Sequence, residues 1–192
     1  MAFFGFGKRR FSDLSEQEIL ALAISAEEDD SRIYQAYADN LRERYPASAA
    51  VFDEMAEEED THRRWLIELH REKFGERIPL IRRENVSGFY ERRPVWLTKH
   101  LPLETIRQEA LVMEAASRRF YLQAYKRTRD AAVRKLLGDL AAAEGGHLSL
   151  AHRLGLTHLP ADVKVEENEA AHRLFVLQYV QPGLVGLMDG SV

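Results

Sequence analysis

The sequence predicts an all-α protein, a four-helix bundle with a long crossover and an extra C-terminal helix. Apolar residues recur at helical spacing through four long segments of the 192-residue chain. Gly 11 and Pro 6 are low counts, which favours long helices over strands and turns. The irregular stretch 76–101 divides the four segments into two pairs. A connection of that length favours a crossover rather than a tight hairpin.

The predicted helices have recognisable ends. They span about 12–45, 47–74, 102–128, 130–154 and 162–180. Ser15 and Glu18 form a capping box at the start of the first segment, and Pro46 closes it. Gly75 ends the second segment and Gly155 the fourth.

Composition excludes several classes of protein. Lys+Arg 27 against Asp+Glu 31 gives a net charge of -4, so nucleic acid is not an expected partner. The chain has no cysteine, which excludes disulfides, Cys-type zinc sites and thiolate-bound iron centres. Any metal must therefore be held by His, Asp and Glu. The first ten residues, MAFFGFGKRR, do not form a signal peptide, so we expect a cytoplasmic location.

The two halves of the chain repeat one pattern. Each half has a glutamate followed seven residues later by a tyrosine, and then a Glu-x-x-His motif on a later helix. The first copy is Glu27, Tyr34, Glu59 and His62, and the second is Glu114, Tyr121, Glu144 and His147. The spacing between the two glutamates is 32 residues in the first copy and 30 in the second. The chain therefore reads as two copies of a helix pair.

This pattern predicts a site for two metal ions. Glu-x-x-His places a carboxylate and an imidazole on one face of a helix. Two such motifs plus one Glu from each of two other helices give four carboxylates and two imidazoles, the ligand set of di-iron and di-manganese bundles. Four carboxylates neutralise two divalent cations, and imidazole with carboxylate suits iron. Tyr34 and Tyr121 are expected to pack in the core and to support the ligands by hydrogen bonds.

Alternatives exist for individual residues. Glu59 lies in an acidic run, residues 57–60, and such runs are usually a solvated face. A third Glu-x-x-His, Glu169 and His172, lies outside the repeat and is interpreted as a coincidence. Gly145 and Gly146 interrupt a helix, and we expect them to make room for the metal pair or a small oxidant.

The six ligand candidates resemble the pattern of the ferritin-like superfamily, specifically its rubrerythrin and erythrin branch. The resemblance covers roughly residues 15–154 and implies a di-iron centre. In it Glu59 and Glu144 would bridge the ions, each histidine would bind one ion, and Glu27 and Glu114 would complete the two shells. Two departures stand out. Without cysteine there is no rubredoxin-type iron centre to feed electrons to a peroxidase. Leu111 also stands where rubrerythrin has a further Glu, so the metal shuttling linked to that Glu should be absent or altered.

The C-terminal residues extend the resemblance. GLVGLMDGSV, residues 183–192, is similar to the start of the transmembrane domain of vacuolar-type iron transporters. A ferritin-like domain joined to such a transporter is the arrangement of the erythrin–vacuolar iron transporter family, also called membrane-bound ferritin. The implied division is a flexible segment 1–11, a di-metal bundle 12–160, a helix 161–181 leading to the membrane, and the start of a membrane domain at 182–192. The chain would then be the soluble part, on the cytoplasmic face of a membrane.

The resemblance also implies a function. The domain would bind two iron ions per site, with manganese as an alternative, and could oxidise ferrous iron with dioxygen or peroxide in support of iron export and resistance to oxidative stress. Two further interpretations stay open. One is a non-catalytic iron sensor that gates the transporter, and the other is a soluble di-manganese or di-iron oxidase. A homodimer is expected, with the aromatic crossover Phe89–Leu97 as its candidate interface.

Overall fold

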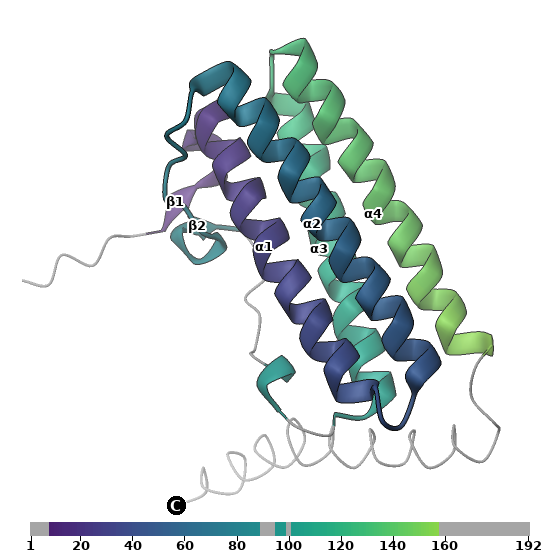
Figure 1. Ribbon diagram of the computed structural model, residues 1–192. Helices are drawn as coiled ribbons and strands as arrows, with labels where there is room; N and C mark the ends of the chain where they lie inside the picture. The colour runs from purple at the N-terminus through teal and green to yellow at the C-terminus, as the bar shows by residue number, and fades with distance from the viewer. Residues whose placement is uncertain (1–7, 89–94, 99–100, 158–192) are drawn as a thin grey trace, which may run out of the picture.

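The computed structural model describes residues 8–88, 95–98 and 101–157. Four long helices dominate it: α1 (Glu16–Leu41), α2 (Pro46–Phe74), α3 (Leu103–Arg127) and α4 (Ala131–Thr157) (Figure 1). The minor elements are the 3-10 turns η1 (Phe11–Asp13), η2 (Arg83–Asn85) and η3 (Val95–Leu97), and the two-residue strands β1 (Arg9–Arg10) and β2 (Val86–Ser87). The predicted all-α bundle is confirmed.

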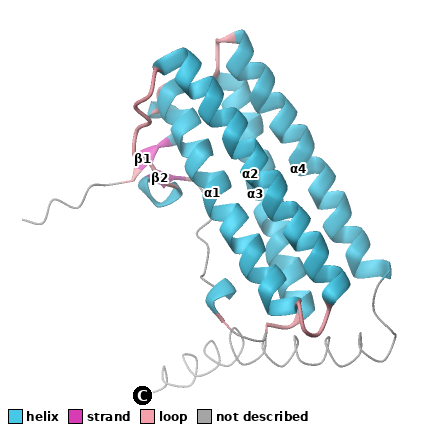
Figure 2. Ribbon diagram, in the orientation of Figure 1, coloured by secondary structure: helices cyan, strands magenta, loops and turns pink. Residues whose placement is uncertain are grey.

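The bundle consists of two antiparallel helix pairs joined by a long crossover. Helices α1 and α2 form one pair, and α3 and α4 form the other. The chain leaves α2 at one end of the bundle and returns to the opposite end before α3 begins, so α2 and α3 run in the same direction (Figures 1 and 2). This arrangement lets all four helices place side chains in one central layer.

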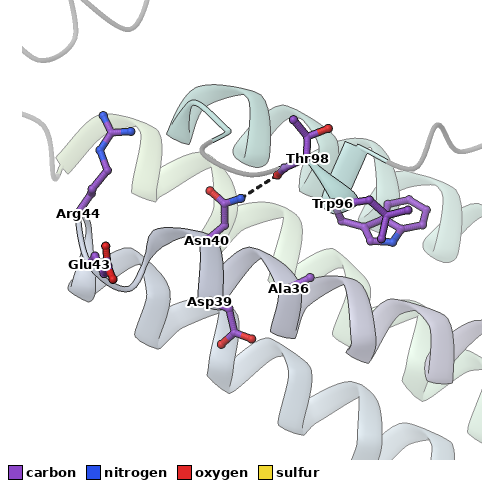
Figure 3. A pocket seen from close by; sticks show the side chains of 8 residues that line it. Ala36, Asp39, Asn40, Glu43, Arg44, Trp96 and Thr98 are labelled. Atoms are coloured by element: carbon purple, nitrogen blue, oxygen red, sulfur yellow. Dashed lines mark hydrogen bonds between the residues drawn. The ribbon is translucent and has the colours of Figure 1, made fainter.

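The crossover is attached to the N-terminal segment before α1 and to the last turns of α1. At one end β1 and β2 pair in parallel, with Arg9 opposite Val86, a contact that the sequence did not suggest. At the other end Asn40 on α1 donates to the Thr98 carbonyl at 3.0 Å and accepts from the Leu101 amide at 3.1 Å. The first of these bonds is drawn in Figure 3, beside a hollow of about 380 Å³ next to Trp96.

Most helix ends follow the sequence, with two exceptions. The first segment is predicted to reach residue 45, but α1 already ends at Leu41. The Ser15–Glu18 capping box is present, and Gly75 follows α2 with a φ of 81°. Pro46 is the first residue of α2, a position where its missing N–H costs nothing. The predicted end of the fourth segment at Gly155 is wrong, because α4 continues to Thr157. A glycine inside a helix costs only about 1 kcal/mol, so it does not by itself end one. The predicted fifth helix lies outside the described residues.

The core has two apolar clusters with a polar layer between them. One cluster includes Leu20 and Ile24 of α1 with Leu137 of α4. The other includes Tyr37 of α1 and Met113 of α3. Along every helix the candidate ligands fall between the residues of these clusters or next to them, which places the ligands near the middle of the bundle, away from both ends.

Candidate metal centre

All six predicted ligands lie in the polar layer, and the four helices contribute to it in a repeated way. Helices α1 and α3 each carry one glutamate, and α2 and α4 each carry a Glu-x-x-His pair. The residues are Glu27, Glu59, His62, Glu114, Glu144 and His147, and each is at most 6% exposed. The acidic run 57–60 is divided as the helix turns, because Glu59 is buried whereas Glu57 and Glu58 are exposed. The solvated-face interpretation therefore fits its neighbours but not Glu59.

The six side chains form two overlapping groups of possible ligands. The first group is Glu27, Glu59, His62 and Glu144, and the second is Glu59, Glu114, Glu144 and His147. Within each group one ligand atom per residue lies within 4.8 Å of the others. Glu59 and Glu144 belong to both groups, whereas each histidine and each of the other two glutamates belongs to one. This is the division of roles expected for two ions joined by bridging carboxylates.

Both histidines turn the same ring nitrogen toward the carboxylates. Nδ1 of His62 lies 3.2 Å from Glu59 Oε2 and 3.8 Å from Glu27 Oε2. Nδ1 of His147 lies 3.3 Å from Glu114 Oε2 and 3.7 Å from Glu59 Oε1. The two rings are stacked, with centroids 6.2 Å apart. Each Nδ1 is therefore the atom of its ring that is placed to bind a metal.

Two buried tyrosines cross-link the halves of the repeat. Tyr34 on α1 donates to Glu114 on α3, and Tyr121 on α3 donates to Glu27 on α1. Each tyrosine thus bonds the glutamate of the other half, rather than the one that precedes it by seven residues. Burial and the neighbouring carboxylates raise the pKa of both phenols well above 10.0, so both remain hydrogen-bond donors. The expected supporting bonds are present.

A second polar network lies one turn of α1 beyond Glu27. Asp30 on α1 is buried and accepts from both terminal nitrogens of Arg83, at 2.6 and 3.2 Å, and from Ser117 on α3 at 3.2 Å. Arg83 comes from the crossover. Burial alone would lower the pKa of Arg83, but the charge and hydrogen bonds of Asp30 outweigh that effect and raise it. The crossover thus supplies a permanent positive charge close to the carboxylate layer.

Without bound cations, the layer concentrates negative charge in a buried place. Burial and the charge of Glu27 raise the pKa of Glu59 well above 4.5, and burial and Glu114 do the same for Glu144. Burial alone would lower the pKa of His147, but the adjacent carboxylates of Glu114 and Glu58 raise it to about 9. The layer therefore holds protons that bound cations would displace.

Several buried atoms in the layer lack a hydrogen-bond partner among the described residues. They are Oε2 of Glu27, Oε2 of Glu114, Oε1 of Glu144 and Nδ1 of His147. A buried carboxylate oxygen without a donor costs free energy unless a cation compensates it. All four atoms belong to the two ligand groups. The donor set and these unsatisfied atoms together fit a pair of divalent cations.

A hollow of about 450 Å³ lies on the outer side of α2, next to the ligand layer. It is lined by Glu54, Glu57, Glu58, Thr61, His62 and Trp65. His62 is the one ligand candidate in its wall. Glu58 also accepts a hydrogen bond from Nε2 of His147.

The mid-helix glycines do not make room for the metal pair, so that part of the expectation is wrong, whereas room for a small oxidant stays a prediction. A Cβ at Gly145 would meet Arg118 at 3.6 Å, and one at Gly146 would meet nothing within 4 Å. Their neighbours are an arginine side chain and open space rather than carboxylates. The closest approach is instead at Gly138, where a Cβ would lie 3.3 Å from the Tyr125 ring.

Sequence reasoning missed Glu58, Asp30 and Arg83. Each is a single charged residue outside the repeated pattern, and none has a charged counterpart in the other half. The Glu169–His172 motif lies outside the described residues, so its interpretation as a coincidence stays a prediction.

Comparison with known proteins agrees with the arrangement of the helices. The sequence model of the family described as Rubrerythrin matches residues 18–155, a range that contains all six ligand candidates. Among solved structures, a hypothetical protein from Pyrococcus furiosus, Pfu-1136390-001, superposes with a TM-score of 0.65 at 23% identity, covering 77% of this chain and 93% of that one. At that identity the similarity shows the fold alone. No curated protein matches the chain.

The helices of the bundle are not membrane spans. None of the helices in the part of the chain that the structure describes is both long and apolar enough to cross a bilayer. Residues 182–192, where the sequence suggests the start of a membrane domain, lie outside that part.

Proposed function

The chain belongs to the rubrerythrin family, and from this premise we propose that its bundle binds two ferrous ions and oxidises them with dioxygen or peroxide. The observation that carries the proposal is the pair of overlapping ligand groups that share Glu59 and Glu144. A single-ion site would not need two shared carboxylates and two separate histidines. Manganese is the alternative metal, because the same oxygen-rich ligand set suits it.

Each residue has a defined part in this proposal. Glu59 and Glu144 would be shared by the two ions, His62 and His147 would each hold one ion through Nδ1, and Glu27 and Glu114 would complete the two sets of ligands. Tyr121 and Tyr34 hold those last two carboxylates by hydrogen bonds. Bound iron would supply electrons, and two electrons with two protons convert one peroxide into two waters. The apolar clusters on both sides of the layer keep water away from the ions.

Metal binding and oxidation can be tested separately. Metal-free protein is titrated with ferrous iron without oxygen, and we expect about two ions per chain. Oxygen or peroxide is then added, and we expect formation of ferric iron faster than in buffer alone. Glu144→Gln should abolish the faster formation of ferric iron, whereas Glu57→Gln, an exposed control on α2, should not. Binding of two ions without faster oxidation would favour the sensor function instead, and failure to bind them would contradict the di-iron site.

We also propose that the domain serves a membrane iron transporter. The support is the similarity of residues 183–192 to the start of such a transporter's membrane domain. A bilayer span needs about 20 mostly apolar residues, and the test is to read the parent gene past Val192. A stop codon or a polar continuation there would contradict this proposal and leave the di-iron proposal untouched.

The proposed homodimer is tested on its own. Of the candidate interface, residues 89–94 lie outside the described part of the chain, and Leu97 is 74% exposed. Analytical ultracentrifugation should give twice the chain mass. Leu97→Glu should shift the equilibrium toward monomer if the crossover forms the interface.

A further inference from the structure

We propose that Glu58 is a positioning residue for His147 and that it makes the two metal positions unequal. Its carboxylate holds the outer nitrogen of the ring, so that Nδ1 stays directed at the carboxylate layer. The inference rests on the proposed di-metal function and deepens it, because it assigns a role to a residue outside both ligand groups.

The two nitrogens of His147 face different partners. Nδ1 lies near Glu114 and Glu59 inside the layer, whereas Nε2 bonds the Glu58 carboxylate on the outer side of α2. The bond crosses from α4 to α2 and therefore fixes the ring against a different helix. An imidazole that binds a metal through Nδ1 must keep its proton on Nε2, and a carboxylate acceptor at Nε2 favours that tautomer.

In the other half of the repeat, the outer nitrogen of the histidine has no carboxylate partner among the described residues. His62 also turns Nδ1 inward, but no described residue forms a hydrogen bond with its Nε2. Its ring instead packs against Trp65, with centroids 5.6 Å apart, at the wall of the outer hollow. On α4 the position that corresponds to Glu58 is Ala143, so the second copy of the repeat supplies no carboxylate there. The two halves of the repeat therefore have the same ligands but differ in the hydrogen bond to the outer nitrogen of the histidine.

This asymmetry has a consequence for metal affinity. Loss of an outer partner of a metal-binding histidine typically weakens metal binding about 10–100-fold. The ion held by His147 and Glu114 should accordingly bind more tightly than the ion held by His62 and Glu27. The side chain of Glu58 is 58% exposed, so its removal should leave the fold intact.

The chain offers a matched control. Glu57 is also exposed, precedes Glu58 on α2 and lines the same hollow. Glu57→Ala removes the same charge from the same surface without removing a bond to a histidine. Glu58→Gln keeps an oxygen acceptor without the charge, so it should lie between wild type and Glu58→Ala.

Two measurements test the proposal. Titration with ferrous iron in the absence of oxygen should show two unequal steps in the wild type. Glu58→Ala should weaken the tighter step about 10–100-fold, whereas Glu57→Ala should leave both steps unchanged. In ¹⁵N-labelled protein loaded with diamagnetic Zn²⁺, the Nε2–H proton of His147 should be protected from exchange. This protection from exchange should be lost in Glu58→Ala and retained in Glu57→Ala.

The outcomes separate this inference from the function on which it rests. Wild-type protein that fails to bind two ions contradicts the di-metal site itself. Wild-type protein that binds two ions, with Glu58→Ala and Glu57→Ala alike in both measurements, overturns the positioning role alone.

Discussion

Each histidine of the metal layer belongs to one ligand group, and this division can be tested residue by residue. His62 lies with Glu27 and His147 with Glu114, while Glu59 and Glu144 are common to both. Removing a shared ligand should therefore affect both ions, and removing a histidine should affect one.

We expect His62→Ala or His147→Ala to lower bound iron from about two ions per chain toward one. Iron content of the purified variants measures this directly. His172→Ala is the control, because His172 lies outside the repeat and should leave iron content unchanged. Equal losses in His172→Ala and His147→Ala would show that the third Glu-x-x-His also binds metal.

The crossed tyrosines make a second prediction at this scale. Tyr121→Phe removes the only donor that the structure shows for Glu27 Oε1 within the described residues, and Oε2 of the same carboxylate already lacks one. A buried acceptor left unsatisfied costs about 1–3 kcal/mol, which chemical denaturation of metal-free protein would measure. Tyr125→Phe is a control, since Tyr125 is only partly buried and stacks on Arg134. A loss of the same size in both variants would mean that the bond to Glu27 contributes nothing specific.

At the scale of the helices, the repeat carries most of what the sequence could predict. Ligands at i and i+3 must share a helix face, so the spacing alone places Glu59 with His62 and Glu144 with His147. The length of the irregular stretch 76–101 predicted the crossover. Arg83 could not be placed, because which residue of an irregular segment reaches the core depends on a path that no periodicity encodes. The role of Glu58 could not be predicted for a related reason, because its partner, His147, lies on another helix.

The glycines of α4 give a test of helix energetics. Nothing lies within 4 Å of a Cβ at Gly146, so Gly146→Ala should stabilise the metal-free protein by up to about 1 kcal/mol. That gain corresponds to roughly 2–4 °C in melting temperature for a chain of this size. Gly138→Ala should gain less or lose stability, because its Cβ would lie 3.3 Å from the Tyr125 ring. A larger gain at Gly138 than at Gly146 would contradict this description of α4.

The start of α1 has a pH-dependent contribution to stability. The Arg9 guanidinium and the Ser15 amide lower the pKa of Glu18 from 4.5 to about 2. Because the folded pKa is depressed, the stabilisation is complete above about pH 4.5 and disappears as the pH falls toward 2. Glu18→Gln keeps the capping acceptor but removes the charge. Its melting temperature should lie below that of wild type at about pH 7 and approach it near pH 2; a constant difference across that range would contradict the assigned cause.

For the whole molecule, the position of the polar layer links metal binding to folding. Four carboxylates lie between two apolar clusters that hold the helices together. Without bound cations, those carboxylates repel one another or bind protons, so the bundle is less stable than its apolar packing alone would make it. Bound cations remove that cost, and they bind the folded chain rather than the unfolded one.

We therefore expect ferrous or manganous ions to raise the melting temperature. A ligand at about 100 times its dissociation constant stabilises by about 2.7 kcal/mol, or roughly 5–10 °C here. Glu59→Gln separates the two effects, because a neutral amide relieves the repulsion but cannot bridge two cations. Its metal-free form should melt above metal-free wild type, and added metal should shift it much less. Wild-type protein that shows no shift at saturating metal would contradict an inward-facing ligand layer. A Glu59→Gln variant that melts lower without metal would show instead that the unpaired carboxylates are already compensated, by protons and by the charge of Arg83, before any ion binds.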